Sequence, residues 1–422
     1  MPRTYKSGSA NLHIDLAAPP KWSYAAGAEI IGNVTRHSPV VSPEASVTLR
    51  LNGRVKTKIT VSRGQNGKDV YRGRWNLFQP RSVLLYKGPL HLGQDGSDPL
   101  LWPFSINLPT GPDLSVLTGH FKGESFLPLN EDHVTNSPLP GTAFVINDSI
   151  GSRTSHGFVE YFLTATLQYN RAGSLETDAA TLPITVRHPP GPIPATVIYR
   201  TKPWTTDEKI HSQRLVPGME SAELSFKQKT QKFFHSSKVP GLHFTVEIGS
   251  PRVIQFDNPE PFPFTVRLVP QRKTTSPAIR DVVYQFRLNW VKMKIKSSNT
   301  VIAPGNWIDS VHRHETEEKS SFNLEQAFSR LECPVMIPCS EGEKNKVNIG
   351  SMLQLVLHSN GLNAWLTSGG RPLPLVANFA PDYTTYNIRH RNLTVEWELS
   401  LSLVEETISV KAKLPVQILP AF

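Results

Sequence analysis

Alternation of apolar and polar side chains over a long stretch is the feature that most constrains this chain. From Val47 to Val61 the odd-numbered positions are mostly apolar and the even-numbered positions mostly polar. The apolar members are Val47, Leu49, Leu51, Val55, Ile59 and Val61, and the polar members are Arg50, Asn52, Arg54, Lys56 and Lys58. Because successive side chains of a strand point to opposite faces, the pattern predicts a strand with one buried and one solvated face. Such a stretch is long for one strand, so Gly53 predicts a bend or bulge within it.

The same alternation recurs along the chain, whereas helical periodicity is nearly absent. Further alternating stretches are 159–169, 242–248, 262–268, 393–403 and 408–418. One short helix is expected at 323–331, where Leu324, Phe328 and Leu331 share a stripe. Alternating strands form antiparallel sheets with one dry face. The predicted fold class is therefore all-β, with two antiparallel immunoglobulin-like β-sandwich domains in tandem.

The length and the proline distribution predict where the two domains meet. The chain has 422 residues, which is enough for two cores of about 200 residues each. A proline-dense segment from His188 to Pro194 is typical of a stiff connector. A polar stretch at 205–239 follows it, and the next strand is expected near Leu242. We expect a first sandwich at 1–187, a Pro-rich and polar linker at 188–239, and a second sandwich at 240–422.

The cysteine content and the ends of the chain indicate a cytoplasmic protein. The only two cysteines, Cys333 and Cys339, fit neither a disulfide framework nor a zinc-ligand pair. We expect both to be reduced, half-buried thiols, with a redox pair as the alternative. The first eleven residues lack the apolar segment of a signal peptide, and no run of 18 apolar residues exists.

Several short segments resemble one family in the order in which that family carries them. Tyr24 to Val34 fits the pattern Y-x-x-G-x-x-I-x-G-x-V, and 47–53 supplies the strand that follows. Trp102 to Pro109 and the segments 126–128 and 159–165 are similar to later parts of the family's N-terminal domain. In the second half of the chain, 379–388 and 413–420 are similar to the closing segments of the family's fungal members. Together they resemble the arrestin-like family, and its alpha-arrestin branch (fungal-type arrestin-related trafficking adaptors) more than the visual and beta-arrestins.

The resemblance implies a non-catalytic adaptor or scaffold. Such a protein binds membrane cargo proteins or their cytosolic tails together with trafficking or ubiquitylation machinery, in the cytoplasm or at the periphery of the plasma membrane or endosomes. Two departures from the family matter. No PPxY motif is present, since the nearest segment, 19–22, ends in Trp22. A ubiquitin ligase would therefore be recruited by another route. The phosphate-sensing lysine pair after the first strand is replaced by Ala17-Ala18-Pro19-Pro20.

Two rows of cations are the candidate partner-binding residues. Arg50, Arg54, Lys56 and Lys58 share one strand face, and Lys292, Lys294 and Lys296 share another. Clustered cations contact phosphates or anionic headgroups, including those of a membrane surface. The alternative is that they only keep a strand face solvated and protect an edge from aggregation. The net charge of +10 permits anionic partners, and no nucleic-acid-binding signature is present, so nucleic acid is not expected.

No catalytic motif was found in the sequence. A nucleophile elbow, a P-loop, an HExxH motif and a kinase signature are all missing. We therefore expect no catalytic residues, no cofactor and no metal. The compact group of His312, His314 and Glu315 is interpreted as a solvated loop rather than a metal site. The alternative function is a β-sandwich ligand-binding module, or a hydrolase without a recognisable motif, because sandwiches host many functions.

Overall fold

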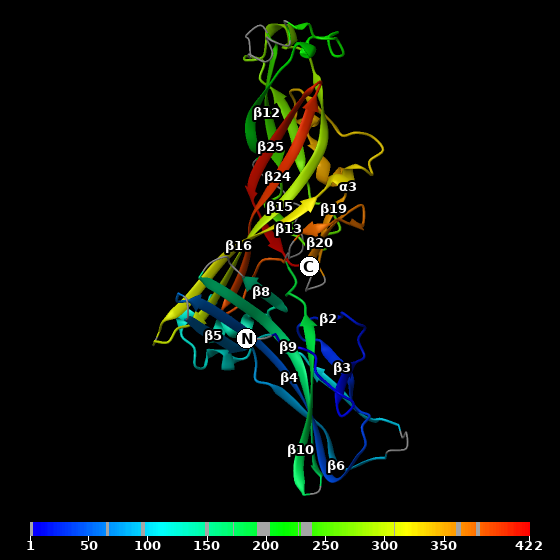
Figure 1. Ribbon diagram of the computed structural model, residues 1–422, viewed down its shortest axis with the longest axis vertical. Coiled ribbons are helices and arrows are strands. Elements are labelled where there is room, and N and C mark those ends of the chain that lie inside the picture. The colour runs from blue at the N-terminus through cyan, green and yellow to red at the C-terminus, as the bar shows by residue number, and fades with distance from the viewer. Residues whose placement is uncertain are drawn as a thin grey trace.

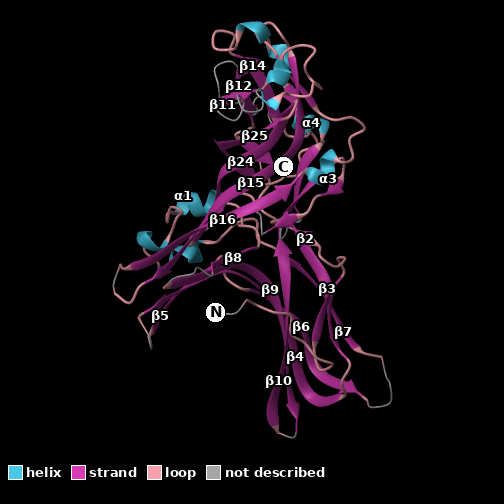
Figure 2. Cartoon of the chain, turned by 45° about the horizontal axis from the view of Figure 1, so that its top comes forward, coloured by secondary structure: helices cyan, strands magenta, loops and turns pink. Residues whose placement is uncertain are grey.

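The computed structural model is built almost entirely of β-strands (Figure 1, Figure 2). It describes residues 3–64, 67–93, 98–147, 152–171, 173–191, 203–226, 228, 239–307, 309–359, 364–376 and 380–422. Strands account for 57% and helices for 8%, so the all-β prediction is confirmed. The molecule is elongated, with the N-terminal half at one end and the C-terminal half at the other (Figure 1).

Two sheets make up the N-terminal half. A three-stranded sheet has the order β1 (His13–Leu16), β3 (Glu29–Arg36) and β7 (Leu100–Asn107). The larger sheet has the order β2 (Ser23–Tyr24), β10 (Ser174–Val186), β9 (Arg153–Arg171), β4 (Val40–Ser62) and β5 (Lys68–Asn76). In addition, β6 (Arg81–Leu92) pairs with β4, and β8 (Ala143–Asn147) pairs with β9.

The C-terminal half is dominated by one large sheet. Its main path is β11 (Trp204–His211), β12 (Gly241–Gly249), β14 (Thr265–Pro270), β17 (Met336–Cys339), β15 (Tyr284–Pro304), β16 (Val311–Asn323) and β22 (Leu375–Val376). The strands β18 (Val347–Asn348), β23 (Tyr383–Thr384), β24 (Ile388–Leu403) and β25 (Glu406–Pro415) join it off this path. Two small sheets pair β13 (Val253–Gln255) with β26 (Gln417–Leu419), and β19 (Leu355–Ser359) with β20 (Ala364–Ser368) and β21 (Arg371–Pro372).

Helices are short in the part of the chain that the structure describes. The α-helices are α1 (Glu131–Asn136), α3 (Glu325–Phe328) and α4 (Ile349–Met352). Single 3-10 turns lie at η1 (Leu114–Leu117), η2 (Lys122–Glu124), η4 (Gln213–Leu215), η5 (Pro277–Ile279) and η6 (Glu343–Asn345). The helix expected at 323–331 is α3. It spans only four residues, Glu325–Phe328, and is therefore shorter than the predicted segment.

No bulge interrupts the pairing of β4 with β9 at Gly53, where a bend or bulge was expected. The register of β4 with β9 runs without a shift from Ala45 to Val61. Gly53 instead marks the place where the other neighbour of β4 changes from β6 to β5. A Cβ atom at Gly53 would lie 2.4 Å from the Phe78 ring. The glycine therefore serves close packing of an aromatic side chain rather than a break in the strand.

The expected linker also contains a strand. Residues 204–211 form β11, which pairs antiparallel with β12 from Trp204 opposite Ile248 to His211 opposite Gly241. Ile210 and Leu215 are buried in the core of the C-terminal half. The first strand of this half therefore begins near residue 204 rather than near Leu242. It has no clear alternation in the sequence, because the less exposed positions Thr206 and Glu208 are polar, like the exposed ones.

Buried apolar side chains form two clusters, and the second half of the chain contributes to both. The first cluster is built from residues of the C-terminal half. The other is built from strands of the N-terminal half together with Val301, Ala303, Tyr386 and Ile388. The ends of β15 and β24 thus extend past their own core and complete the core of the N-terminal half.

The burial pattern of β15 changes where it enters this junction. Alternate residues are buried up to Ile295, and from Ser297 to Ala303 every residue is buried. The polar segment of Ser297, Ser298, Asn299 and Thr300 is at most 6% exposed. Its strand is covered on both faces by the two halves of the molecule, so polarity alone would place it wrongly in a loop.

Buried hydrogen bonds fix the two halves at this junction. The Thr57 hydroxyl donates to the Ile302 carbonyl oxygen at 2.7 Å and accepts from Asn387 Nδ2 at 3.0 Å. The Trp75 ring of β5 stacks on Tyr386 with ring centroids 4.8 Å apart. The Phe126 amide donates to the Tyr386 carbonyl oxygen at 2.6 Å. Hydrogen bonds and ring stacking thus connect residues of the two halves that are hundreds of positions apart in the sequence.

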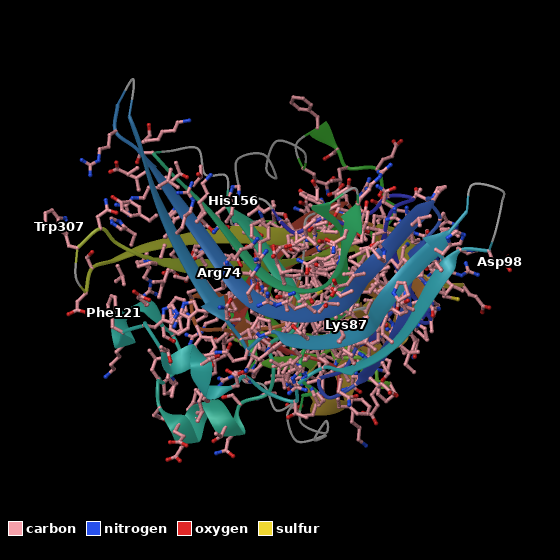
Figure 3. All side chains as sticks on the ribbon, turned by 90° about the horizontal axis from the view of Figure 1, so that it is seen from below. Arg74, Lys87, Asp98, Phe121, His156 and Trp307 are labelled. Carbon is pink, nitrogen blue, oxygen red and sulfur yellow. The ribbon has the colours of Figure 1, made fainter. Side chains whose placement is uncertain are left out.

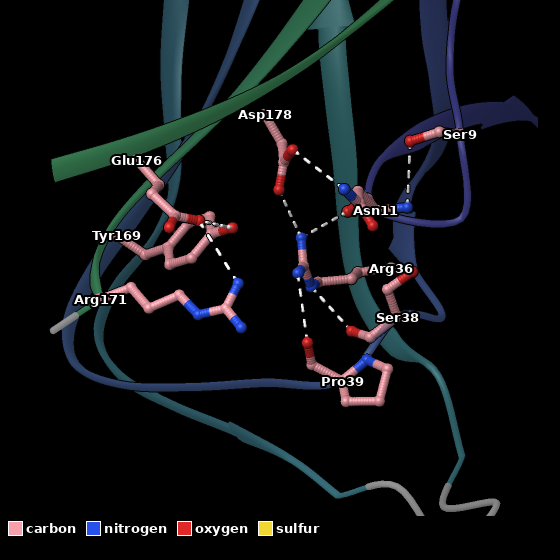
Figure 4. Close-up of polar contacts among 9 residues, drawn as sticks. All are labelled: Ser9, Asn11, Arg36, Ser38, Pro39, Tyr169, Arg171, Glu176 and Asp178. Carbon is pink, nitrogen blue, oxygen red and sulfur yellow. Dashed lines mark hydrogen bonds and ion pairs between the residues drawn. The ribbon is translucent and has the colours of Figure 1, made fainter. Parts of the chain in front are cut away.

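A buried arginine joins the two sheets of the N-terminal half (Figure 4). Arg36 of β3 is 3% exposed and forms an ion pair with Asp178 of β10 at 2.7 Å. Its guanidinium also donates to the carbonyl oxygens of Asn11, Ser38 and Pro39. Because each of the three guanidinium nitrogens has an acceptor, the charge is tolerated in the interior.

Replacing Thr57 with valine should destabilise the protein by about 1–3 kcal/mol, because two buried polar groups lose their partner. Valine has nearly the same shape, so packing changes little, but Asn387 Nδ2 and the Ile302 carbonyl oxygen lose the hydroxyl. Urea unfolding followed by tryptophan fluorescence measures the change. Thr48→Val on the half-buried part of the same strand is the control, and equal effects of both substitutions would contradict the role of the junction.

Candidate anion-binding face

The even-numbered side chains of β4 lie on one face of a sheet that also carries cations from β5. Across β4 and β5, Lys58 is opposite Arg72 and Lys56 is opposite Arg74. Across β4 and β9, Lys58 is opposite His156 and Arg54 is opposite Glu160. Figure 3 labels Arg74 and His156 in the view along the long axis. Among the sequence-predicted residues, Arg54, Lys56 and Lys58 are therefore brought together.

Lys56 does not belong to a solvated face, and this corrects the expectation from the alternation. Its side chain is 7% exposed, and Nζ lies 3.0 Å from Glu160 Oε1. Burial lowers the pKa of Lys56, and repulsion from Arg54 and Arg74 acts in the same direction. The aromatic ring of Phe158 lies 5.9 Å from the ammonium nitrogen. Lys56 is thus a buried, paired cation beneath the surface.

Glu160 is the carboxylate that holds this part of the face together. Arg54 Nη2 lies 3.2 Å from Glu160 Oε2. From the N-terminal segment, the Thr4 amide and hydroxyl donate to the same carboxylate at 3.1 and 2.6 Å. Burial alone would raise the pKa of Glu160, but the hydrogen bonds from Thr4 and Lys56 lower it below its ordinary value. Arg54, stacked 4.6 Å over Phe162, is held by the same network.

Three further cations on this face have no carboxylate partner within the described residues. Lys58 is half-buried, and Arg72 and Arg74 are exposed. Arg74 Nε donates only to the neutral amide oxygen of Asn76, at 3.3 Å. Burial and then repulsion from Arg54 lower the pKa of Arg74. We call Lys58, Arg72 and Arg74 the open cation triad.

The sequence contains a signal for the part of the triad that was missed. In β5 the even positions Lys68, Arg72 and Arg74 alternate with the buried Tyr71 and Trp75. This is the same pattern as in β4, but the alternation alone does not predict that these two strands are neighbours. Arg50 was correctly placed on the polar face and is exposed. It lies opposite Thr164 and Ser82 rather than among the other cations.

The second predicted row is neutralised by carboxylates on neighbouring strands. Lys294 Nζ lies 3.1 Å from Glu398 and 3.7 Å from Glu396. Its hydrogen bond to Glu398 raises the pKa of Lys294. Lys296 Nζ lies 2.5 Å from Glu317. Lys292 lies 4.8 Å over the Trp290 ring. This row fits a cross-strand ion-pair network better than a site for an external anion.

The junction between the halves contains cavities lined by neutral histidines. A small cavity of about 70 Å³ is lined by His188, Asn299, Glu318, Tyr383 and His390, among others. The His390 ring stacks on Tyr383, and Nδ1 lies 2.7 Å from Asn299 Oδ1. Burial lowers the pKa of His390 to about 4. This histidine is therefore neutral at neutral pH.

A larger cavity of about 370 Å³ lies beside the connector and is walled largely by prolines. Ser137, His133 and Asp382 also line it. The Ser137 hydroxyl donates to the His133 carbonyl oxygen at 2.6 Å, with His133 Nε2 at 3.3 Å. Asp382 Oδ1 accepts hydrogen bonds from the Asn392 amide and side chain. Ser137 thus contacts His133, whereas Asp382 is engaged by Asn392, so these hydrogen bonds do not connect the three residues as nucleophile, base and orienting acid.

The remaining candidate groups have structural contacts. His312 stacks on Tyr71 with centroids 3.5 Å apart, and His314 Nδ1 lies 2.9 Å from Ser155 Oγ. No group of three or more His, Cys, Asp or Glu residues that could hold a metal ion occurs among the described residues. Cys333 is exposed and Cys339 is buried, so neither is the half-buried thiol that was expected. Burial raises the pKa of Cys339 to about 12.

Comparisons with known proteins do not assign a family. No protein-family model matches the sequence, and no curated protein matches it significantly. Within the described part of the chain, no helix has the length and apolar character needed to cross a membrane.

Glu160→Gln should destabilise the protein by about 3–5 kcal/mol, because it leaves Lys56 buried without a counter-ion. The side chains of the pair are 7% and 6% exposed, so water cannot replace the lost partner. Chemical unfolding measures the effect. The double variant Glu160→Gln/Lys56→Met should recover most of the stability, because the buried lysine charge is gone and the remaining cation, Arg54, is partly exposed. A single variant within about 0.5 kcal/mol of the wild type would contradict this assignment.

Acidification should weaken the protein through His390. Its pKa is about 4 in the folded state and about 6.5 when unfolded. The unfolded chain therefore binds the proton first, and the contribution of neutral His390 is lost as the pH falls from about 6.5 to 4. His390→Gln should reduce this pH dependence by up to about 3 kcal/mol, measured by urea unfolding at pH 7, 5.5 and 4. His91→Gln, at an exposed position, should leave it unchanged.

Proposed function

We propose that this chain is a non-catalytic, arrestin-like adaptor made of two immunoglobulin-like β-sandwiches in tandem. The all-β content and the two buried clusters support this arrangement. In this proposal each cluster is the core of one sandwich, and the proline-rich segment after Val186 connects them. The adaptor would bind cytosolic tails of membrane cargo proteins and bring trafficking or ubiquitylation machinery to them by a route other than a PPxY motif.

The residues that carry the family resemblance have physical roles in the fold, which supports the proposal. Tyr24 is 5% exposed and Ile30 is fully buried. Gly27 has a φ of 81°, a left-handed conformation that favours glycine. A Cβ atom at Gly32 would lie 2.2 Å from the Asp15 carbonyl oxygen. The spacing of these residues is thus dictated by a turn and by close strand packing at this place.

The single observation that carries the functional part is the pairing of like charges on the face of β4 and β5. Lys58 opposes Arg72 and Lys56 opposes Arg74, although like charges directly opposite each other destabilise a sheet. A solubility role does not require this, since Lys292 and Lys294 of the second row lie opposite Glu398 and Glu396. Lys296 lies opposite Lys319, but its ammonium group pairs with Glu317. Within the part of the chain that the structure describes, only Glu160 forms ion pairs with the cations on the first face. An anionic partner would supply the missing negative charge.

A partner protein is favoured over small-molecule chemistry by the same observation. The open cation triad lies on an exposed strand face, where an extended segment can reach it. Arginine guanidinium groups bind carboxylates and phosphates through two parallel hydrogen bonds. The proposed ligand is therefore an acidic segment of another protein, such as the cytosolic tail of a cargo protein.

Binding of an acidic peptide to wild-type and variant protein tests this proposal. The triple variant Lys58→Gln/Arg72→Gln/Arg74→Gln should weaken binding by roughly tenfold or more, since each exposed cation contributes up to about 1 kcal/mol. The matched control Lys292→Gln/Lys294→Gln/Lys296→Gln removes the same charge from the neutralised row and should retain binding. Fluorescence anisotropy at 50 and 300 mM salt measures both effects.

Salt and the control variant separate the proposed site from a general charge effect. Binding to the wild type should weaken at the higher salt concentration, because exposed charges are screened beyond about 8 Å at physiological ionic strength. Equal losses in the two triple variants would show that net charge alone determines binding. An acidic peptide that binds neither the wild type nor the control would overturn the proposed site.

A further inference from the structure

The cations on the proposed face lie in two rows whose spacing is set by the strands. Lys58 and Arg72 form one row across β4 and β5, and Lys56 and Arg74 form the next. Opposed residues in an antiparallel pair have Cα atoms about 4.5–5.5 Å apart. Successive rows on one face are two residues apart, which is about 6.6–6.8 Å along the strand.

Glu160 leaves one uncompensated cationic position in each row. Lys56 is turned toward Glu160, at 3.0 Å, and Arg54 contacts the same carboxylate from the following row. In the first row, Lys58 and Arg72 have no carboxylate partner within the described residues, and in the second row Arg74 contacts only Asn76. Two anion-binding positions thus follow one another along the strand direction, one between Lys58 and Arg72 and one at Arg74.

We propose that the bound segment is extended and presents acidic side chains at alternate positions, i and i+2, to these two rows. This inference rests on the proposed function and adds the conformation and charge pattern of the partner. In an extended chain, residues i and i+2 point to the same side about 6.6–6.8 Å apart, whereas residue i+1 points away. The spacing of the ligand charges then equals the spacing of the rows.

The surroundings of the two rows favour an extended peptide over a lipid surface. Lys58 is half-buried between its cross-strand neighbours Arg72 and His156, so a planar layer of headgroups would meet Arg72 first. A single extended chain is narrow enough to follow the strand direction and reach both. The N-terminal segment already contacts this sheet beside the two rows, with Thr4 bonded to Glu160 and Arg3 lying 5.2 Å over the Phe144 ring.

Peptides of equal composition but different charge order test the inference. One peptide contains four Glu-Thr repeats, and the other contains four consecutive glutamates followed by four threonines. Both carry a neutral dye and are titrated into the full chain at 50 mM salt. The alternating peptide should bind at least fivefold more tightly. This preference should vanish in Lys58→Gln/Arg72→Gln, which removes one of the two positions, and should persist in the matched control Lys292→Gln/Lys294→Gln.

A third peptide, alanine-rich with glutamate at every fourth position, tests a helical ligand. Helical residues four apart lie on one face about 5–6 Å apart, so tighter binding of this peptide than of the alternating one would overturn the extended geometry. A further outcome is that the alternating peptide and the peptide with four consecutive glutamates bind the wild type equally, and that neither binds the Lys58→Gln/Arg72→Gln variant. That result would overturn the proposed i, i+2 spacing of the ligand charges but leave the proposed function intact. Failure of all three peptides, with retained sedimentation on phosphatidylserine vesicles, would overturn both in favour of a membrane surface.

Discussion

The long pairing of β4 with β9 is the constraint on which the N-terminal half depends. The two strands stay in one register from Ala45 to Val61. The odd residues of β4, such as Leu49 and Val55, are fully buried, and its even residues form the cationic face. Because the side-chain period of a strand is two, a slip of one residue would exchange the two sets. The buried Lys56 and Glu160 pair strengthens this selection, since a cation that loses its carboxylate inside the protein is costly.

The same alternating sequence pattern leads to different electrostatic outcomes in the two halves. In the C-terminal half, Glu396 and Glu398 of β24 lie between lysines of β15 and β25. In the N-terminal half, the strand beside β4 supplies two arginines instead. A row of lysines therefore says little about function until its cross-strand neighbours are known, and those neighbours decide whether charge is cancelled or accumulates.

Alternation in the sequence predicted the strands and which of their faces are polar. Most features that it did not predict depend on contacts between residues far apart in the sequence. Arg54 and Lys58 were placed correctly on the polar face of β4, but Lys56 is buried because Glu160, about 100 residues later, lies beside it. Gly53 carries a general signal for a bend, whereas the Phe78 ring that explains it comes from another segment. The polar segment 297–300 has no local feature of a buried strand. It is covered only because two halves of the molecule meet there.

The contribution of β15 and β24 to the N-terminal core has a consequence for synthesis of the protein. All strands of the N-terminal half have been made at Val186, but Tyr386 and Ile388, which complete its core, come about 200 residues later. At 5–20 residues per second this interval lasts roughly 10–40 s. During that time Trp75 and the apolar residues around it lack their cover. The nascent chain therefore passes through a state in which its first half is assembled but open, and chaperones or aggregation compete for that surface until the ribosome reaches residue 388.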